Sequence, residues 1–232
     1  MLQQTQTGRV SEKFLAFIDK FPDFHALSKA SLEEVLKTWQ GLGYNRRAVA
    51  LKKIAENVIT DYNGVLPDSI ETLKSFPQIG HNTASSIVTF AFNRPTVFIE
   101  TNIRRVYIYF FFPGKISIVD KTIVPILEKT MDSENPRNWY YALMDYGVML
   151  KKTFPDLNKR SAHYRKQAPF KGSNREIRGK ILKILINNKN MKKSDLLKEL
   201  KDISPEKLTQ ILNRLEKESF IKNERGNIQI VK

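Results

Sequence analysis

Apolar side chains recur at helical spacing through most of the first 150 residues of the chain. In the opening segment, Val10, Phe14, Phe17, Ile18 and Phe21 lie at the separations that place side chains on one face of a helix. No stretch before residue 220 sustains the alternation of a half-buried strand. The pattern predicts an all-α domain over residues 1–150, with helices at about 31–39, 46–62, 68–75, 82–92, 101–111, 120–132 and 137–150.

The last third of the chain is organised differently. Residues 151–173 contain prolines, a glycine and little apolar pattern, so we expect a basic linker or an extended segment packed on the first domain. The apolar spacing over residues 174–232 predicts a separate module, with helices at about 175–187, at 194–200 and after Ser204-Pro205. Two short strands should follow around Arg225-Gly226-Asn227. Three helices followed by a β-hairpin are typical of a winged helix, a variant of the helix-turn-helix.

Positive charge is concentrated in this last third. The chain has 39 Lys and Arg against 24 Asp and Glu, a formal net charge of +15. Residues 1–150 hold 17 basic and 15 acidic residues, whereas residues 151–232 hold 22 and 9. Such a field suits a polyanion, and nucleic acid is the one we expect. Two alternatives stay open: a basic tail that only aids solubility, and a module that docks onto proteins.

Composition excludes several classes of protein. No run approaches the roughly 20 apolar residues that span a bilayer, and no secretory signal follows Met1. We therefore expect a cytoplasmic, nucleoid-associated monomer with no membrane partner. The chain has no cysteine, which excludes disulfides, cysteine nucleophiles and thiolate-held zinc or iron–sulfur groups. Its three scattered histidines form no metal-binding pattern, so we expect no metal and no cofactor.

The strongest local motif is the segment Leu73-Lys74-Ser75-Phe76-Pro77-Gln78-Ile79-Gly80-His81-Asn82-Thr83-Ala84. One helix ends, proline and glycine make a tight turn, and a second helix begins at once. Backbone N–H groups of the turn and of the new helix are suited to gripping a phosphate, and Gly80 allows a close approach. This is a helix–hairpin–helix signal, although an ordinary helix–helix corner would give a similar pattern.

A second motif delivers a carboxylate to the start of a predicted helix. The apolar run Val97-Phe98-Ile99 leads to Glu100, and Asn102, Arg104 and Arg105 follow on that helix. An acid at this place has an ordinary structural role, because it stabilises the positive end of the helix dipole. Beside a nucleic-acid grip it can also be a catalytic acid held next to a DNA strand.

With these motifs in place, the chain resembles a known family. Four strings occur in order: Met1-Leu2-Gln3-Gln4-Thr5-Gln6-Thr7, Gly41-Leu42-Gly43-Tyr44, Phe76-Pro77-Gln78-Ile79-Gly80 and Glu100-Thr101-Asn102-Ile103-Arg104-Arg105-Val106. Together with Ala142-Leu143-Met144-Asp145-Tyr146-Gly147, they resemble the helix–hairpin–helix (HhH-GPD) base-excision DNA glycosylases. The likeness is strongest to the MutY-type adenine glycosylases and covers residues 1 to about 150. The fold class implied is an all-α HhH-GPD domain followed by the winged-helix-like module.

The resemblance implies roles for individual residues. Glu100 would be the carboxylate that stabilises the sugar cation formed when the glycosidic bond breaks. Gln3 and Gln4 would fill the gap left by the flipped-out base. Gln78, Gly80 and Thr83 would contact phosphate. Tyr44, Arg46, Arg47, His81 and Asn82 complete the expected DNA-binding set, although for Arg46 and Arg47 a solvated helix face is an equal alternative.

The sequence departs from the family in several ways. The family's general acid is a glutamate two positions before the methionine that is Met1 here, and its helix-start aspartate is Glu100. Asn82 stands where bifunctional members carry a nucleophilic lysine, so Schiff-base lyase chemistry is not expected. The region of the family's iron–sulfur cluster is the basic segment 159–166, and cluster-free members exist. The module at 174–232 replaces the lesion-sensing domain.

These observations predict a monofunctional DNA N-glycosylase of base excision repair. It would remove adenine mispaired with guanine or 8-oxoguanine from double-stranded DNA that carries a mispair or an oxidised base. Without the acid, residues 1–232 are expected to show little activity. A start at an internal methionine of a longer gene would explain this, and we favour that explanation over a degenerate protein that binds DNA without cutting. A non-catalytic DNA-binding protein and a winged-helix regulator are the alternative functions.

Overall fold

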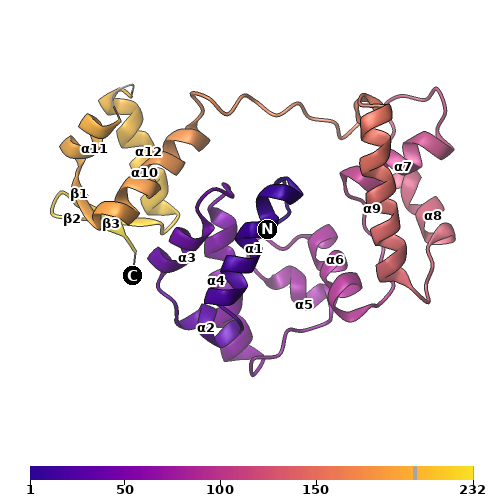
Figure 1. The fold of residues 1–232 in the computed structure, drawn as a ribbon, viewed down its shortest axis with the longest axis horizontal. Coiled ribbons are helices and arrows are strands. Elements are labelled where there is room, and N and C mark those ends of the chain that lie inside the picture. Colours follow the sequence, from indigo (N-terminus) through magenta and orange to yellow (C-terminus); the bar gives the residue numbers. More distant parts are fainter. Residues whose placement is uncertain (201–202, 232) are drawn as a thin grey trace. The chain divides into compact units, whose positions relative to one another are not determined.

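The structure is a computed structural model that describes residues 1–200 and 203–231. It is mostly helical, with a small antiparallel sheet near the C-terminus (Figure 1). The chain forms two compact units. Unit 1 combines Met1–Leu66 with Ala168–Lys232, and unit 2 is Pro67–Gln167. We describe each unit by itself.

The N-terminal part of unit 1 consists of α1 (Thr7–Lys20), α2 (Phe24–Lys29), α3 (Leu32–Trp39) and α4 (Arg46–Asp61). The predicted capping box at α3 is confirmed, since the side chains and backbones of Ser31 and Glu34 bond reciprocally. The short helix α2 was not expected from the sequence. It begins where the Asp23 side chain accepts the backbone N–H of Ala26 at 2.7 Å.

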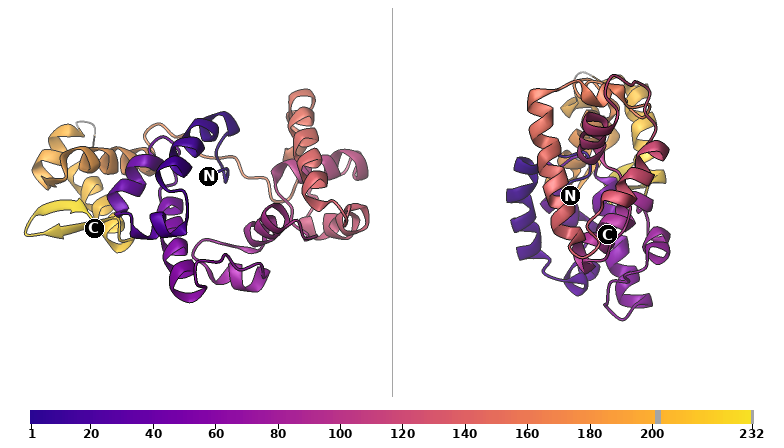
Figure 2. Two further views of the ribbon diagram at one scale, coloured as in Figure 1. Left: turned by 60° about the horizontal axis from the view of Figure 1, so that its bottom comes forward. Right: turned by 90° about the vertical axis from the view of Figure 1, so that its right-hand side faces the viewer.

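The C-terminal part of unit 1 is the winged-helix-like module, which comprises α10 (Asn174–Asn188), β1 (Asn190–Lys192), α11 (Lys193–Glu199), α12 (Pro205–Lys217), β2 (Ile221–Glu224) and β3 (Asn227–Ile230). Figure 2 shows the hairpin of β2 and β3. The sheet order is β1-β3-β2, with Gln229 of β3 paired to Asn190 and to Lys222. The expectation of no strand before residue 220 is wrong for β1, because three residues are too few to show alternation and the strand forms only by pairing with β3.

One apolar core joins the two parts of unit 1. Its buried members include Phe17 and Trp39 from the first helices and Leu182, Leu215 and Phe220 from the module. Phe17 and Trp39 meet edge to face, with ring centroids 5.9 Å apart. The compact units therefore do not follow a division at residue 150, because helices α1–α4 share a core with the module rather than with α5–α9.

Unit 2 contains α5 (Ile70–Ser75), α6 (His81–Phe92), α7 (Thr101–Phe111), α8 (Asp120–Thr130), α9 (Pro136–Thr153) and the 3₁₀ turn η1 (Leu157–Arg160). The helices predicted over these residues are confirmed, with ends that coincide or differ by at most three positions. Its core includes Ile103, Ile108, Ile123, Leu127 and Tyr140, all fully buried. Beyond η1, Ser161 pairs with Ile118, and Ala162 donates its N–H to the Ile118 carbonyl at 2.9 Å. The start of the basic segment thus packs on unit 2.

Candidate functional site

The helix–hairpin–helix motif is formed as the sequence predicts. Helix α5 ends at Ser75, and α6 begins directly after Gly80. Leu73 and Phe76 are buried and anchor the turn, while Gln78 adopts a left-handed conformation with φ of 60°. Gly80 is the N-cap of α6 and offers no side-chain cap, and a Cβ built on it meets no atom within 4 Å. The first turn of α6 therefore begins beside open space, as an anion-binding helix start requires.

Two side chains of α6 tie this motif to the segment before Glu100. The Asn82 amide nitrogen donates to the carbonyl of Ile99 at 3.0 Å. The His81 ring nitrogen Nε2 lies 3.3 Å from the carbonyl of Val97. Both side chains contact backbone carbonyls within the protein, and the DNA contact expected for these two residues stays a prediction. The consequence is that the hairpin and Glu100 are held together in one unit.

Glu100 is the N-cap of α7. Its Oε1 accepts the backbone N–H of Asn102 at 2.7 Å and that of Ile103 at 3.0 Å. The second oxygen, Oε2, has a longer contact of 3.4 Å with the Asn102 side-chain amide. The ordinary structural role of this acid is therefore present. One carboxylate oxygen is used for capping, and the other is the less engaged of the two.

The segment that carries Glu100 is fixed from behind by α9. The buried Tyr140 hydroxyl donates to the Thr96 carbonyl at 2.7 Å and accepts the backbone N–H of Phe98 at 3.3 Å. Burial raises the pKa of the Tyr140 hydroxyl to about 12, so it stays protonated and can keep donating. The Tyr140 and Phe98 rings are stacked, with centroids 4.2 Å apart. These contacts set where the chain enters α7.

Arg105 of α7 links this helix to α9. It is 3% exposed, and its NH1 donates to Asn102 Oδ1 at 2.8 Å and to the Gly147 carbonyl at 2.6 Å. Burial lowers the pKa of Arg105 from its ordinary value, and the Glu100 charge opposes this. Helices α7 and α9 approach closely at this point. A Cβ added to Gly147 would lie 2.5 Å from the Asn102 carbonyl oxygen.

Gln3, Gln4 and Tyr44 lie in unit 1, where Arg47 organises the loops that carry them. Arg47 donates to the carbonyls of Met1 and Gln3, to the Thr5 hydroxyl and to the carbonyls of Leu42 and Gly43. Its guanidinium also lies over the rings of Trp39 and Tyr44, 5.5 and 5.3 Å from their centroids. Burial lowers the pKa of this guanidinium. All of these contacts are internal, so a direct DNA contact by Arg47 stays a prediction.

Arg46 likewise has a partner in the protein. Its Nε donates to Glu218 of the C-terminal module at 2.8 Å, and Arg178 of α10 donates to the same carboxylate. These two guanidinium groups hold the pKa of Glu218 down at about 2, with Arg46 the larger influence. The DNA contact expected for Arg46 therefore also stays a prediction.

The structure thus places the expected site residues in two sets. Gln78, Gly80, His81, Asn82, Thr83 and Glu100 belong to unit 2, whereas Gln3, Gln4, Tyr44, Arg46 and Arg47 belong to unit 1. Sequence reasoning missed Arg175 and Glu218. The partner of Arg175 is Tyr44 in the loop before α4, 131 residues away, and a partner of Glu218 is Arg46 in α4, 172 residues away. Periodicity carries no signal of such contacts. Sequence reasoning also missed the role of Arg105. Its position between Ile103 and Val106 on a helix expected to be buried could have indicated a buried arginine.

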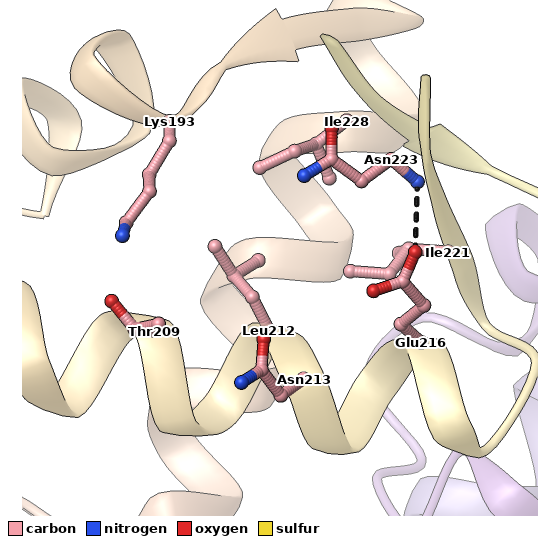
Figure 3. A pocket seen from close by; sticks show the side chains of 8 residues that line it. All are labelled: Lys193, Thr209, Leu212, Asn213, Glu216, Ile221, Asn223 and Ile228. Carbon is pink, nitrogen blue, oxygen red and sulfur yellow. Dashed lines mark hydrogen bonds between the residues drawn. The ribbon is translucent and has the colours of Figure 1, made fainter. Parts of the chain in front are cut away.

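A small hollow lies in the C-terminal module, between α12 and the sheet (Figure 3). Its volume is about 100 Å³, with Leu212, Ile221 and Ile228 as its apolar lining. Glu216 accepts the backbone N–H of Asn223 at 3.1 Å across one end. Ligand pockets usually measure roughly 300–1,000 Å³, so this hollow is too small for a base or a cofactor.

No group of three or more His, Cys, Asp or Glu within residues 1–200 and 203–231 is arranged to hold a metal ion. None of the helices over the same residues has the length and apolar character of a membrane-spanning segment.

Curated DNA glycosylases resemble this chain in sequence. The chain is 36% identical over 154 residues to an adenine DNA glycosylase of Buchnera aphidicola, an alignment that covers 65% of this chain and 43% of that protein. It is 32% identical over 152 residues to the human adenine DNA glycosylase, covering 64% of this chain and 28% of the human protein. The chain thus spans less than half the length of these curated relatives.

Solved structures share the fold. A thermostable thymine-DNA glycosylase matches with a TM-score of 0.55 and 24% identity, over 64% of this chain and 70% of that one. A trapped endonuclease III–DNA covalent intermediate matches with a TM-score of 0.53 and 20% identity, over 73% of each chain. The family model described as HhH-GPD superfamily base excision DNA repair protein matches residues 1–126. Because this match spans more than half of its residues, the chain belongs to the HhH-GPD superfamily of base excision DNA repair proteins.

Proposed function

We propose that this chain is a monofunctional DNA N-glycosylase that removes adenine mispaired with guanine or 8-oxoguanine in double-stranded DNA. The observation that carries the proposal is the bond from Asn82 of the hairpin to the carbonyl of Ile99, directly before Glu100. It holds a phosphate-binding helix start and a single carboxylate in one unit. The choice of adenine as the base removed is based on the similarity to relatives named adenine DNA glycosylase.

The chemistry follows from that placement. The target adenosine is flipped out of the duplex while the hairpin holds a backbone phosphate. The C1′–N9 bond breaks heterolytically: its electron pair leaves with adenine, which is protonated, and the sugar becomes an oxocarbenium ion. The Glu100 carboxylate stabilises that cation until water adds at C1′ and loses a proton. We assign no residue of the chain as the acid that protonates adenine.

Asn82 accounts for the monofunctional part of the proposal. Its side-chain amide is not a nucleophile, and it is bonded to a backbone carbonyl. The sugar therefore has no amine at this place with which to form a Schiff base, and strand cleavage should not accompany base release.

One observation supports a second candidate, a DNA-binding protein that does not cut the glycosidic bond. Glu100 Oε1 already accepts two backbone N–H groups as the cap of α7. In this alternative, Glu100 only caps the helix, and the hairpin supplies binding alone.

Glu100→Gln separates the two candidates, because the glutamine amide oxygen can still cap α7 while the charge is lost. Without an assigned acid, the unmutated chain is expected to release adenine slowly from a duplex with adenine opposite 8-oxoguanine. We expect Glu100→Gln to reduce this single-turnover release about 10²–10³-fold further, with duplex affinity nearly unchanged. Glu71→Gln, on the exposed surface of α5, is the matched control and should release adenine at the unmutated rate.

Each outcome has a distinct meaning. Unmutated protein that prefers the mispair but releases adenine no faster than the uncatalysed reaction would favour the binding-only alternative. Equal release by the Glu100→Gln variant would show that Glu100 is a helix cap and no more. Equal affinity for mispaired and fully paired duplexes would overturn the proposed substrate.

A further inference from the structure

The loop Gly41–Tyr44 of unit 1 is held in a strained conformation. Gly41, Gly43 and Tyr44 have φ values of +93°, +67° and +47°, and for tyrosine this left-handed region is unfavourable. The Trp39 indole donates to the Gly43 carbonyl at 3.0 Å, and Arg47 donates to the same carbonyl. A tyrosine backbone stays in this region only when its surroundings fix it, so the contacts of the Tyr44 side chain matter.

Arg175 at the start of α10 is one of those contacts. Its NH1 donates to the Tyr44 hydroxyl at 3.0 Å, and its NH2 donates to the Ala168 carbonyl at 2.8 Å. Its guanidinium lies 5.9 Å from the centroid of the Tyr44 ring and 5.9 Å from that of Phe170. The planar fork of an arginine can make both hydrogen bonds at once, which the point charge of a lysine cannot reproduce.

Tyr44 is therefore contacted by two arginines, one near it in the sequence and one far from it. Arg47, three residues after it, lies over its ring, whereas Arg175 comes from the C-terminal module and reaches its hydroxyl. Arg47 of α4 and Arg175 of α10 thus both hold the loop through Tyr44.

The module is anchored beside the same loop at a second point. Glu218 accepts from Arg46, two residues after Tyr44, and from Arg178, one helical turn after Arg175. The Arg178 guanidinium also lies 5.6 Å from the ring centroid of the buried Phe220. Because this anchor is continuous with the shared apolar core of unit 1, Arg175 has a fixed base from which to hold the loop.

We propose that Arg175 is a positioning residue, through which the C-terminal module holds Tyr44 and its loop in the geometry that recognises a mispaired duplex. The inference rests on the proposed function for the statement that Tyr44 faces DNA. It goes beyond that function by assigning the module a part in substrate discrimination through a protein contact. A residue that acts in this way changes specificity, whereas a phosphate contact changes affinity for all duplexes alike.

The test uses the full chain and compares Arg175→Met with Lys183→Met, which removes the same charge from the exposed side of the same helix. Affinities are measured for a fluorescent duplex with adenine opposite 8-oxoguanine and for its fully paired counterpart. Loss of the hydrogen bond to the Tyr44 hydroxyl should reduce the ratio of the two affinities about fivefold in Arg175→Met. The control should leave this ratio unchanged.

A double-mutant cycle tests whether the effect passes through the Tyr44 hydroxyl. Tyr44→Phe should reduce the ratio by a similar factor, and adding Arg175→Met to it should reduce the ratio no further. Hydrogen exchange of residues 41–47 in the free protein provides a readout without DNA. It should become about fivefold faster in Arg175→Met and stay unchanged in Lys183→Met.

Unchanged hydrogen exchange of this loop in Arg175→Met would overturn the inference. So would the result that Arg175→Met and Lys183→Met each weaken binding to the mispaired and the fully paired duplex by the same factor. Faster exchange together with no mispair preference in the unmutated protein would refute the proposed function and still establish that Arg175 holds the loop. An unmutated preference that Arg175→Met leaves intact would keep the proposed function and refute the inference.

Discussion

Replacing Gly147 by alanine should destabilise unit 2, because α9 crosses the start of α7 at this residue. The added Cβ would lie 2.5 Å from the Asn102 carbonyl oxygen, 2.6 Å from Asn102 Cβ and 2.8 Å from the Asn102 carbonyl carbon. Two of these three atoms belong to the backbone and cannot rotate away. Restoring ordinary contact at about 3.4 Å requires the helices to separate by about 1 Å, which would loosen a core packed at close to crystal density.

The magnitude is the difference of two effects. Forcing a side chain into a packed interface costs about 1–3 kcal/mol. Alanine recovers up to about 1 kcal/mol in the helix, because it has the higher helix propensity. Because the added Cβ clashes with backbone atoms, the packing cost lies near the upper end of its range, at about 3 kcal/mol. We therefore expect a net loss of about 2 kcal/mol in the free energy of unfolding. The contact from Arg105 to the Gly147 carbonyl, and with it the support of the Glu100 cap, should weaken as well.

Gly179→Ala is the matched control, since Gly179 also lies within a helix and a Cβ there meets nothing within 4 Å. It should stabilise the protein by up to about 1 kcal/mol. Urea unfolding followed by circular dichroism gives the free energies, and hydrogen exchange of α7 and α9 locates the loss in unit 2. Equal or greater stability of Gly147→Ala, or a loss matched by Gly179→Ala, would refute the reasoning.

Three further predictions concern charge and chemistry. Arg46 and Arg178 lower the pKa of Glu218 to about 2. The contribution of this carboxylate to the free energy of unfolding is therefore complete above about pH 4.5 and is lost as the pH falls toward 2. Because Arg46 is largely exposed, we expect about 1–2 kcal/mol, and Glu218→Gln should remove this part of the pH dependence of urea unfolding. Arg225 lies at the tip of the β2–β3 hairpin. In titrations of duplex DNA, Arg225→Gln should reduce the slope of log affinity against log salt concentration by about 0.9. An unchanged slope would show that this tip does not touch phosphate. Borohydride should trap no covalent complex with adenine-mispaired DNA, because Asn82 cannot form a Schiff base; an adduct would mean that another amine attacks the sugar.

Local structure and the family motifs were predictable from the sequence. Helices α4, α6 and α7, the capping box at Ser31, the hairpin before Gly80 and the strands β2 and β3 depend on periodicity and turn chemistry within a few residues. The position of Glu100 at the start of α7 was predictable for the same reason. These features are encoded locally, since each depends on neighbours that lie within one or two helical turns.

The tertiary structure decided which charged residues are free to meet a ligand and which are used inside the protein. Arg46 and Arg47 are adjacent in the sequence, yet one pairs with Glu218, 172 residues away, and the other supports the Gln3 and Tyr44 loops. The strand β1, the contact of Arg175 with Tyr44 and the crossing at Gly147 likewise exist only in the folded chain. Such contacts join residues far apart in the sequence, and the sequence alone does not distinguish a buried arginine from an exposed one. Only packing, which removes water from one guanidinium and leaves it on the next, separates their roles.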